Sequence, residues 1–187
     1  VFASLSAEEM ITLADELSKK AQEQANGRYY AIANSLKIFA YYLDGTGQNT
    51  LEQLSRELSA SKDNEDWPAE SFIRQLIGYV AWSQGQREYA ITNLKEAFGV
   101  IPESGDDAAL ARLALLHALL YAHADAGDLN AMLETSQQLI ELGEQSAIPI
   151  GGDSIIRNFA YLFRLRGDYE IAYEFYKSYD QILKDNE

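Results

Sequence analysis

The sequence predicts an all-α protein, built as one array of antiparallel helix pairs with about nine helices. Apolar residues such as Leu5 and Leu13 recur at helical spacing along almost the whole chain. Only three prolines interrupt 187 residues, so long helices can run between them. Gly85, Gly127 and Gly167 recur at intervals of 42 and 40 residues in similar surroundings, which indicates an internal repeat.

Several helix starts are marked by capping residues. Ser6 and Glu9 form a capping-box pattern, which satisfies free backbone amides at the start of a helix. An acid stands just ahead of an apolar periodic run at Asp66, Asp106 and Asp153. We expect these acids to cap helices.

Breaks between helices are expected where glycine, proline and small polar residues gather. These breaks fall at Gly27, 44–47, Gly85, 102–105, Gly127, 151–152 and Gly167. The polar stretch 61–66 is a looser connection, but it is too short to require a second domain. We therefore expect a single repeat domain over residues 1–187.

The clearest repeat spans residues 71–102 and reads SFIRQLIGYVAWSQGQREYAITNLKEAFGVIP. It resembles a tetratricopeptide repeat (TPR), in which a small residue in the first helix lets the second helix pack closely and a glycine turns the chain. The residues that carry the resemblance are Gly78, Gly85, Ala90, Leu94, Ala97 and Pro102.

A second clear repeat spans residues 154–184, and its matching residues are Ala160, Gly167, Tyr169, Ala172 and Tyr176. It departs from the pattern at Tyr179, where alanine is usual, and it lacks the final proline. Two further repeats, near 28–60 and 111–145, are degenerate. The later one has Leu120 and Met132 where small residues are expected, and the earlier one keeps Ala40 and a glycine turn.

The resemblance implies a right-handed superhelical array, a TPR-like solenoid whose first helices form a concave groove. In such repeats the residue after the small one faces the groove, which places Tyr79, Tyr121 and Tyr161 on one row. Tyr41 joins the row if Gly47 is the turn glycine of the first repeat. The neighbouring groove positions are Gln75, Trp82, His117, Asp125, Arg157 and Arg164.

These groove residues allow two interpretations. Exposed tyrosines offer rigid contact area for a peptide, but the same rings could fill gaps between adjacent helices. Arg157 and Arg164 lie two helical turns apart and could clamp a carboxylate or phosphate, or they could form salt bridges with nearby acids.

Several functional classes find no support in the sequence. The net charge of -14 and the absence of a basic run argue against nucleic acid, and the chain has no cysteine. His117 and His123 are six residues apart, about 120° around a helix, so they cannot share a metal. The loop at 44–49 lacks the acids of a calcium site and the lysine of a phosphate loop. Gly151-Gly152-Asp153 follows no strand, so it is no dinucleotide motif.

We therefore expect a binding module, without catalytic residues, metal or cofactor, whose partner is a protein, a peptide or a small ligand. The ending GDYEIAYEFYKSYDQILKDNE is similar to the last repeat of sensor regions in bacterial membrane-bound histidine kinases and diguanylate cyclases. A start at Val1 rather than Met fits an excised sensor.

The resemblance to those sensors implies the sensory or interaction domain of a bacterial signalling protein. Such a domain would lie in the periplasm, or otherwise outside the cytoplasm, and would meet the membrane only through segments outside this chain. The alternative is a free-standing cytoplasmic adaptor or chaperone of the same fold. The oligomeric state is left open by the sequence.

Overall fold

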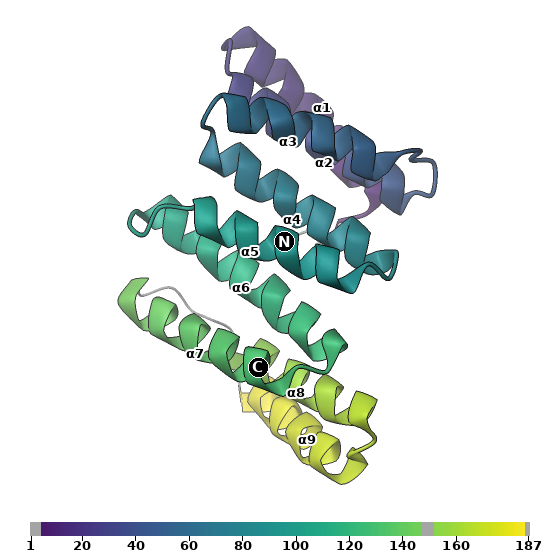
Figure 1. Cartoon of the computed structure of the whole chain (residues 1–187), viewed down its shortest axis with the longest axis vertical. Coiled ribbons are helices and arrows are strands. Elements are labelled where there is room, and N and C mark those ends of the chain that lie inside the picture. The colour runs from purple at the N-terminus through teal and green to yellow at the C-terminus, as the bar shows by residue number, and fades with distance from the viewer. Residues whose placement is uncertain (1–4, 147–151, 186–187) are drawn as a thin grey trace. The chain divides into compact units, whose positions relative to one another are not determined.

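The computed structural model describes residues 5–146 and 152–185, and these ranges contain nine α-helices and no β-strand. The prediction of an all-α fold is therefore confirmed for the described chain, and Figure 1 shows the succession of antiparallel helices. The helices are α1 (Ala7–Glu23), α2 (Gly27–Leu43), α3 (Thr50–Asp63), α4 (Trp67–Ser83), α5 (Arg87–Val100), α6 (Asp106–Ala126), α7 (Leu129–Ser146), α8 (Gly152–Arg166) and α9 (Tyr169–Asp185).

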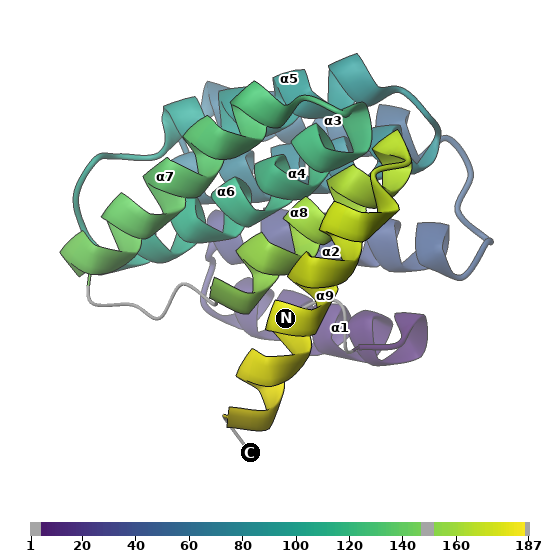
Figure 2. The same cartoon turned by 90° about the horizontal axis from the view of Figure 1, so that it is seen from below.

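The helices fall into two compact units, residues 1–101 with α1–α5 and residues 102–187 with α6–α9. In unit 1, α1 packs on α2, α3 on α4 and α4 on α5, and α2 also contacts α4. In unit 2, α6 pairs with α7 and α8 with α9, and α6 contacts α8 (Figure 2). Contacts between successive first helices are typical of helical repeats. Whether the two units form a single superhelical domain stays a prediction.

Two of the expected helix caps are present. Ser6 Oγ accepts a hydrogen bond from Glu9 N at 3.2 Å, and Glu9 Oε2 accepts one from Ser6 N at 2.7 Å, which completes the capping box. Asp66 Oδ1 accepts a hydrogen bond from Ala69 N at 3.3 Å at the start of α4. These side chains satisfy amides that the helices leave free.

Two other expected caps are wrong. The cap residue of α6 is Gly105, and Asp106 is already the first residue of the helix. Asp153 lies inside α8, which begins at Gly152. An acid in the first turn is also stabilised by the helix dipole, so an acid ahead of an apolar run does not distinguish the cap from the first turn.

Six turns in the described chain share one backbone arrangement, with a left-handed residue just after the helix. In the α4–α5 turn this residue is Gly85, at φ +78°, and Gln86 N donates to Ala81 O at 2.9 Å. This Schellman geometry favours glycine because a Cβ is disfavoured at positive φ. The left-handed residues of these turns are Ala25, Gly45, Glu65, Gly85, Gly127 and Gly167.

The close crossing expected at Gly78 is present between α4 and α5. A Cβ built on Gly78 would lie 3.0 Å from Leu94 Cγ and 3.4 Å from Ala90 O. Ala90 and Ala160, expected at the same kind of crossing, are fully buried. The absence of a side chain at Gly78 therefore sets how closely the two helices approach.

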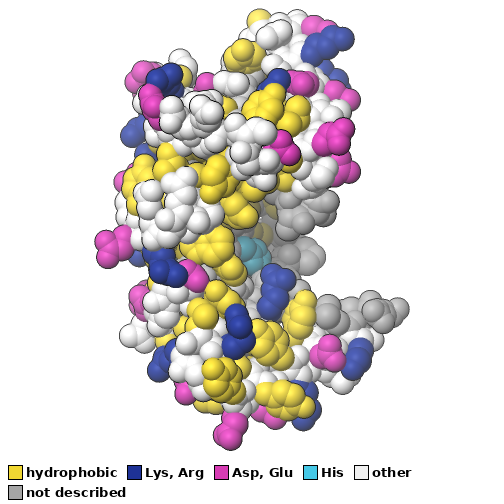
Figure 3. Space-filling view, turned by 90° about the vertical axis from the view of Figure 1, so that its right-hand side faces the viewer, with side chains coloured by type: hydrophobic (Ala, Val, Ile, Leu, Met, Phe, Trp, Pro, Cys, Tyr) yellow, Lys and Arg dark blue, Asp and Glu magenta, His cyan; other side chains and the backbone are white. Residues whose placement is uncertain are grey.

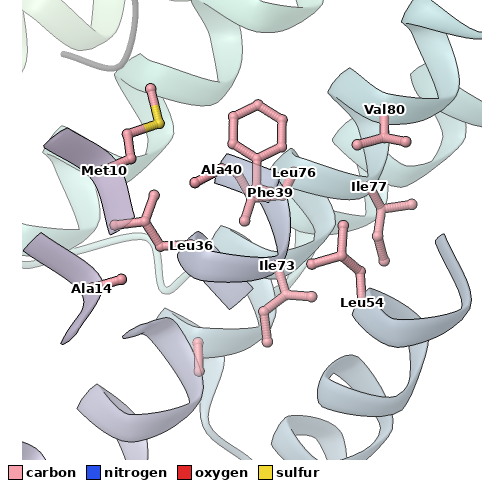
Figure 4. Packing of buried hydrophobic residues seen from close by; sticks show 11 residues of the cluster. Met10, Ala14, Leu36, Phe39, Ala40, Leu54, Ile73, Leu76, Ile77 and Val80 are labelled. Carbon is pink, nitrogen blue, oxygen red and sulfur yellow. The ribbon is translucent and has the colours of Figure 1, made fainter. Parts of the chain in front are cut away.

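The core of unit 1 is apolar, and Figure 4 shows its side chains converging from α1, α2, α3 and α4. One buried cation is neutralised there, because Arg74 pairs with Glu70 at 2.9 Å and also with Glu96. Ser35 is fully buried in α2, and its hydroxyl has no hydrogen-bond partner within the described chain. An unsatisfied buried hydroxyl is destabilising.

We predict that Gly78→Leu lowers the free energy of unfolding by about 1–3 kcal/mol, because the new side chain overfills the crossing with Leu94. Gly99→Leu is the matched control, since Gly99 lies in α5 with nothing within 4 Å of a built Cβ. The free energy of unfolding of this control should rise by about 1 kcal/mol, because leucine has a higher helix propensity than glycine. Denaturant unfolding followed by circular dichroism measures both, and equal effects of the two changes would contradict the packing argument.

We predict that Ser35→Ala raises the free energy of unfolding by about 1 kcal/mol, because it removes a buried hydroxyl that has no partner. The control is Ser61→Ala, since Ser61 is equally buried but its Oγ donates to Glu57 O at 3.1 Å. Thermal unfolding of the two variants should therefore shift differently. A loss of stability in Ser35→Ala would show that its hydroxyl has a role in the folded core.

Candidate functional site

The predicted groove residues lie on four alternate helices, α2, α4, α6 and α8. Unit 1 carries four of them on α2 and α4, namely Tyr41, Gln75, Tyr79 and Trp82. Unit 2 carries the rest on α6 and α8, namely His117, Tyr121, Asp125, Arg157, Tyr161 and Arg164. The two groups are described separately because they belong to different units.

The residue that follows each crossing position faces outward. The crossing residues Gly78, Leu120 and Ala160 are buried. Tyr79 is 46% exposed, Tyr121 is 39% exposed and Tyr161 is half-buried. Successive residues are about 100° apart around a helix, so burying the crossing residue turns its neighbour away from the core. The exposure of this row agrees with the alignment made on glycines.

Tyr41 faces solvent, although the sequence analysis placed it in the tyrosine row on a wrong condition, namely that Gly47 is the turn glycine of the first repeat. The left-handed turn residue after α2 is Gly45, at φ +76°, and not Gly47. The α2–α3 loop is longer than the other turns, so the turn glycine does not align this repeat. Ala40 is nevertheless fully buried and Tyr41 is 40% exposed, which is the burial pattern of the other pairs.

An aromatic cluster joins α2 and α4 in unit 1. The Tyr79 ring meets Phe39 edge-on at a centroid distance of 5.2 Å and lies 6.0 Å from Trp82. A hydrogen bond of 2.7 Å between Tyr42 Oη and Ser83 Oγ also joins the two helices. Phe39 was missed by the sequence analysis because it lies on the buried side of α2. Tyr79 therefore packs against Phe39 of α2 and is also exposed to solvent. Gln75, which precedes Tyr79 by one helical turn, is half-buried.

In unit 2, four predicted residues come together from α6 and α8. The Tyr121 and Tyr161 rings stack, with centroids 5.7 Å apart and an interplanar angle of 13°. Tyr161 Oη donates a hydrogen bond to Asp125 Oδ1 at 3.0 Å. The guanidinium carbon of Arg164 lies 5.4 Å from the Tyr161 ring centre, within cation–π range. We call these four residues the tyrosine-pair cluster.

The Tyr161 phenol is held in its protonated form. Burial raises the pKa of Tyr161 to about 12, and the hydrogen bond to Asp125 and the negative charge of that carboxylate raise it in the same direction. At neutral pH the phenol therefore donates to Asp125 and holds the ring in place beside Tyr121.

Arg157 and Arg164 both lie on the exposed surface of α8, on either side of Tyr161. Neither forms an ion pair with an acid in the part of the chain that the structure describes. Residues three and four apart are neighbours on a helix, so the two cations flank the stacked rings. Figure 3 shows cationic side chains among hydrophobic ones on the lower part of the molecule.

The two histidines lie in different surroundings. His117 Nδ1 and Ser154 Oγ lie 2.9 Å apart and link α6 to α8, whereas His123 is buried. Ser154 was not predicted. Within residues 5–146 and 152–185, no three His, Asp or Glu side chains are placed to hold a metal ion. The described helices include none that is long and apolar enough to span a membrane.

No family model matches the chain, and no curated protein matches it. Two similar solved structures are of a Podosopora anserina putative kinesin light chain with nearly identical TPR-like repeats, one of them a form with a single substitution. Their TM-scores are 0.67 and 0.66 at 15% identity, over 96% and 97% of this chain and 88% and 89% of theirs. This likeness confirms a TPR-like helical-repeat fold. Such repeats generally serve as scaffolds for protein interactions.

We predict that the Tyr161 phenol titrates with a midpoint at about pH 12. This titration is followed as the tyrosinate absorbance of the wild type minus that of the Tyr161→Phe variant. Asp125→Asn should lower this midpoint, because it removes a negative charge beside the phenol. The pKa of Tyr161 is higher in the folded chain than in the unfolded chain, so the protonated phenol stabilises the fold below about pH 10. This stabilisation is lost as the pH rises through about 12. A midpoint unchanged by Asp125→Asn would contradict the coupling of the two groups.

Proposed function

We propose that the chain is a non-catalytic module that binds a segment of another protein or a peptide through the tyrosine-pair cluster on α6 and α8. The observation that supports this is the stacked pair of Tyr121 and Tyr161, partly exposed and flanked by two arginines without ion pairs in the described chain. Aromatic and arginine side chains dominate the affinity of protein interfaces. A small ligand that makes the same interactions would bind through the same tyrosine and arginine side chains.

The two arginines favour a segment that carries an acidic group. Arg157 and Arg164 are exposed, and a guanidinium binds a carboxylate or phosphate oxygen through paired N–H donors. Arg74 behaves differently, because Glu70 and Glu96 already neutralise it. The net charge of -14 repels extended polyanions, so a short acidic segment fits better than nucleic acid.

We further propose that the module is the sensory or interaction domain of a bacterial signalling protein, positioned outside the cytoplasm. The resemblance of residues 167–187 to sensor regions of membrane-bound kinases and cyclases supports this setting. The second candidate is a free-standing cytoplasmic adaptor or chaperone, which the fold accommodates equally well. The full-length gene sequence separates them, because the sensor requires a membrane span and an output domain in the same protein.

We predict that Tyr121→Ala/Tyr161→Ala weakens peptide binding by about 1–3 kcal/mol, because the variant removes the exposed stacked rings. A peptide is first selected from a random displayed library on the immobilised wild-type chain, and its affinity is then measured by fluorescence anisotropy. Arg157→Gln/Arg164→Gln should also weaken binding and should reduce its dependence on salt.

The matched control is Tyr169→Ala/Tyr173→Ala, which removes two more exposed tyrosines, 70% and 65% exposed, from α9. This control should bind as the wild type does. Circular dichroism checks that each variant is folded. A folded Tyr121→Ala/Tyr161→Ala variant with full affinity would rule out the cluster as the binding face, and an unfolded one would show that the rings are core packing.

A further inference from the structure

The cationic side chains of unit 2 are concentrated on α8. Unit 2 contains 15 Asp and Glu residues but only six Lys and Arg residues, and three of these six cations lie on α8. Arg157 and Arg164 take part in no ion pair of the described chain. Other cations of the unit are neutralised, since Arg166, Lys177 and Lys184 pair with Asp168, Glu174 and Asp180. Thus α8 presents two positive charges that attract an acidic partner within an acidic unit.

Arg157 and Arg164 share one face of α8 with Tyr161. Relative to Arg157, Tyr161 lies about 40° around the helix and Arg164 about 20° in the other direction, because successive residues are about 100° apart. The two arginines are separated by about 10.5 Å along the helix axis, because each residue adds about 1.5 Å. Between them, Tyr161 stacks on Tyr121 of α6. A partner segment that meets both arginines therefore runs along α8 and crosses the stacked rings.

The spacing of the two arginines selects among backbone conformations of the partner. In a polyproline II helix, side chains three residues apart point in the same direction and lie about 9.3 Å apart. In a β-strand, side chains on one face lie about 6.6 or 13.2 Å apart, at spacings of two or four residues. The polyproline II spacing differs from the arginine spacing by about 1 Å, and the strand spacings differ by about 3–4 Å. Because the Tyr161 ring holds the guanidinium of Arg164 by a cation–π contact, polyproline II fits better.

An α-helical partner matches the arginine spacing as well, but it fits the rest of the face less well. A bound helix places apolar anchors along two turns into a hydrophobic groove. Between the arginines of α8, the described chain offers one pair of stacked rings, Tyr121 and Tyr161. The residues one turn before and after Tyr121 on α6 are the polar His117 and Asp125. A single aromatic surface is sufficient for a polyproline II segment, whose backbone is already ordered before it binds.

We propose that the tyrosine-pair cluster, together with Arg157, recognises an acidic polyproline II segment in which two acidic residues flank two prolines. One acid binds Arg157, the other binds Arg164, and the prolines pack on the exposed parts of the tyrosine rings. This inference rests on the function proposed above and adds the spacing of the acids and the backbone conformation of the partner. It can therefore fail while the binding face itself stands.

The test compares two peptides of identical composition, acetyl-Gly-Glu-Pro-Pro-Glu-Gly-amide and its isomer acetyl-Gly-Glu-Pro-Glu-Pro-Gly-amide. The affinity of each peptide for the ¹⁵N-labelled full chain is measured by a nuclear magnetic resonance titration. The first peptide should bind about tenfold more tightly, because the isomer turns its second acid away from α8 and loses one hydrogen-bonded ion pair. Equal affinities of the two isomers, or no binding of either, would overturn the proposal.

The preference for one isomer should depend on both arginines. In Arg157→Gln and in Arg164→Gln, the two isomers should bind with equal affinity, because neither peptide then meets two cations. Arg166→Gln is the matched control and should keep the preference, since Arg166 is an exposed cation on the opposite side of α8 and pairs with Asp168. A preference that persists in Arg157→Gln or Arg164→Gln would show that these arginines do not read the spacing.

A helical partner is tested with an alanine-rich helical peptide whose two glutamates are seven residues apart. This peptide should bind more weakly than the peptide with two central prolines, and tighter binding would overturn the proposal in favour of a helix. The library-selected peptide separates the two proposals. If Tyr121→Ala/Tyr161→Ala weakens its binding while the two proline isomers bind equally, the binding face stands and only the polyproline II inference fails.

Discussion

The close crossing of the two helices in a pair is the contact on which the rest of this structure depends. Gly78 lets α5 approach α4 until Leu94 touches it, and Leu120 and Ala160 are buried at the corresponding positions. Each crossing fixes the rotation of the first helix about its own axis. The next residue in the chain must then point away from the core, whatever its type. The outward tyrosine row is therefore a consequence of packing, and the chemistry of that face can vary without changing the fold.

Most of the fold could be predicted because its signals are local. Helical periodicity, the capping box at Ser6 and the recurring turn glycines depend only on residues close in sequence. The predictions that were wrong also concerned local features of the chain. Asp106 and Asp153 occupy the first turn instead of the cap, where an acid is equally favourable. The turns at Ala25 and Glu65 adopt the left-handed conformation without glycine, so composition did not reveal that they share the geometry of the glycine turns.

The candidate site was only partly predictable, because its contacts join residues distant in sequence. The alignment placed Tyr121, Asp125, Tyr161 and Arg164 on neighbouring helices, and the structure brings them into contact. The stacking geometry and the bond from Tyr161 to Asp125 depend on how α6 crosses α8, which no local pattern encodes. Ser154 was missed for the same reason, whereas Phe39 was missed because it lies on the buried side of α2.

Both tryptophans of the chain, Trp67 and Trp82, lie in α4 and hence in unit 1. Indole fluorescence of the intact chain therefore reports on unit 1, while unit 2 contributes only tyrosine emission. Far-ultraviolet circular dichroism, by contrast, follows the helices of both units together. Coincident melting curves from the two signals would indicate that the helix array unfolds as one cooperative body, and separated curves would indicate two bodies. The distribution of two indole rings thus provides a native optical label for the cooperativity of the array.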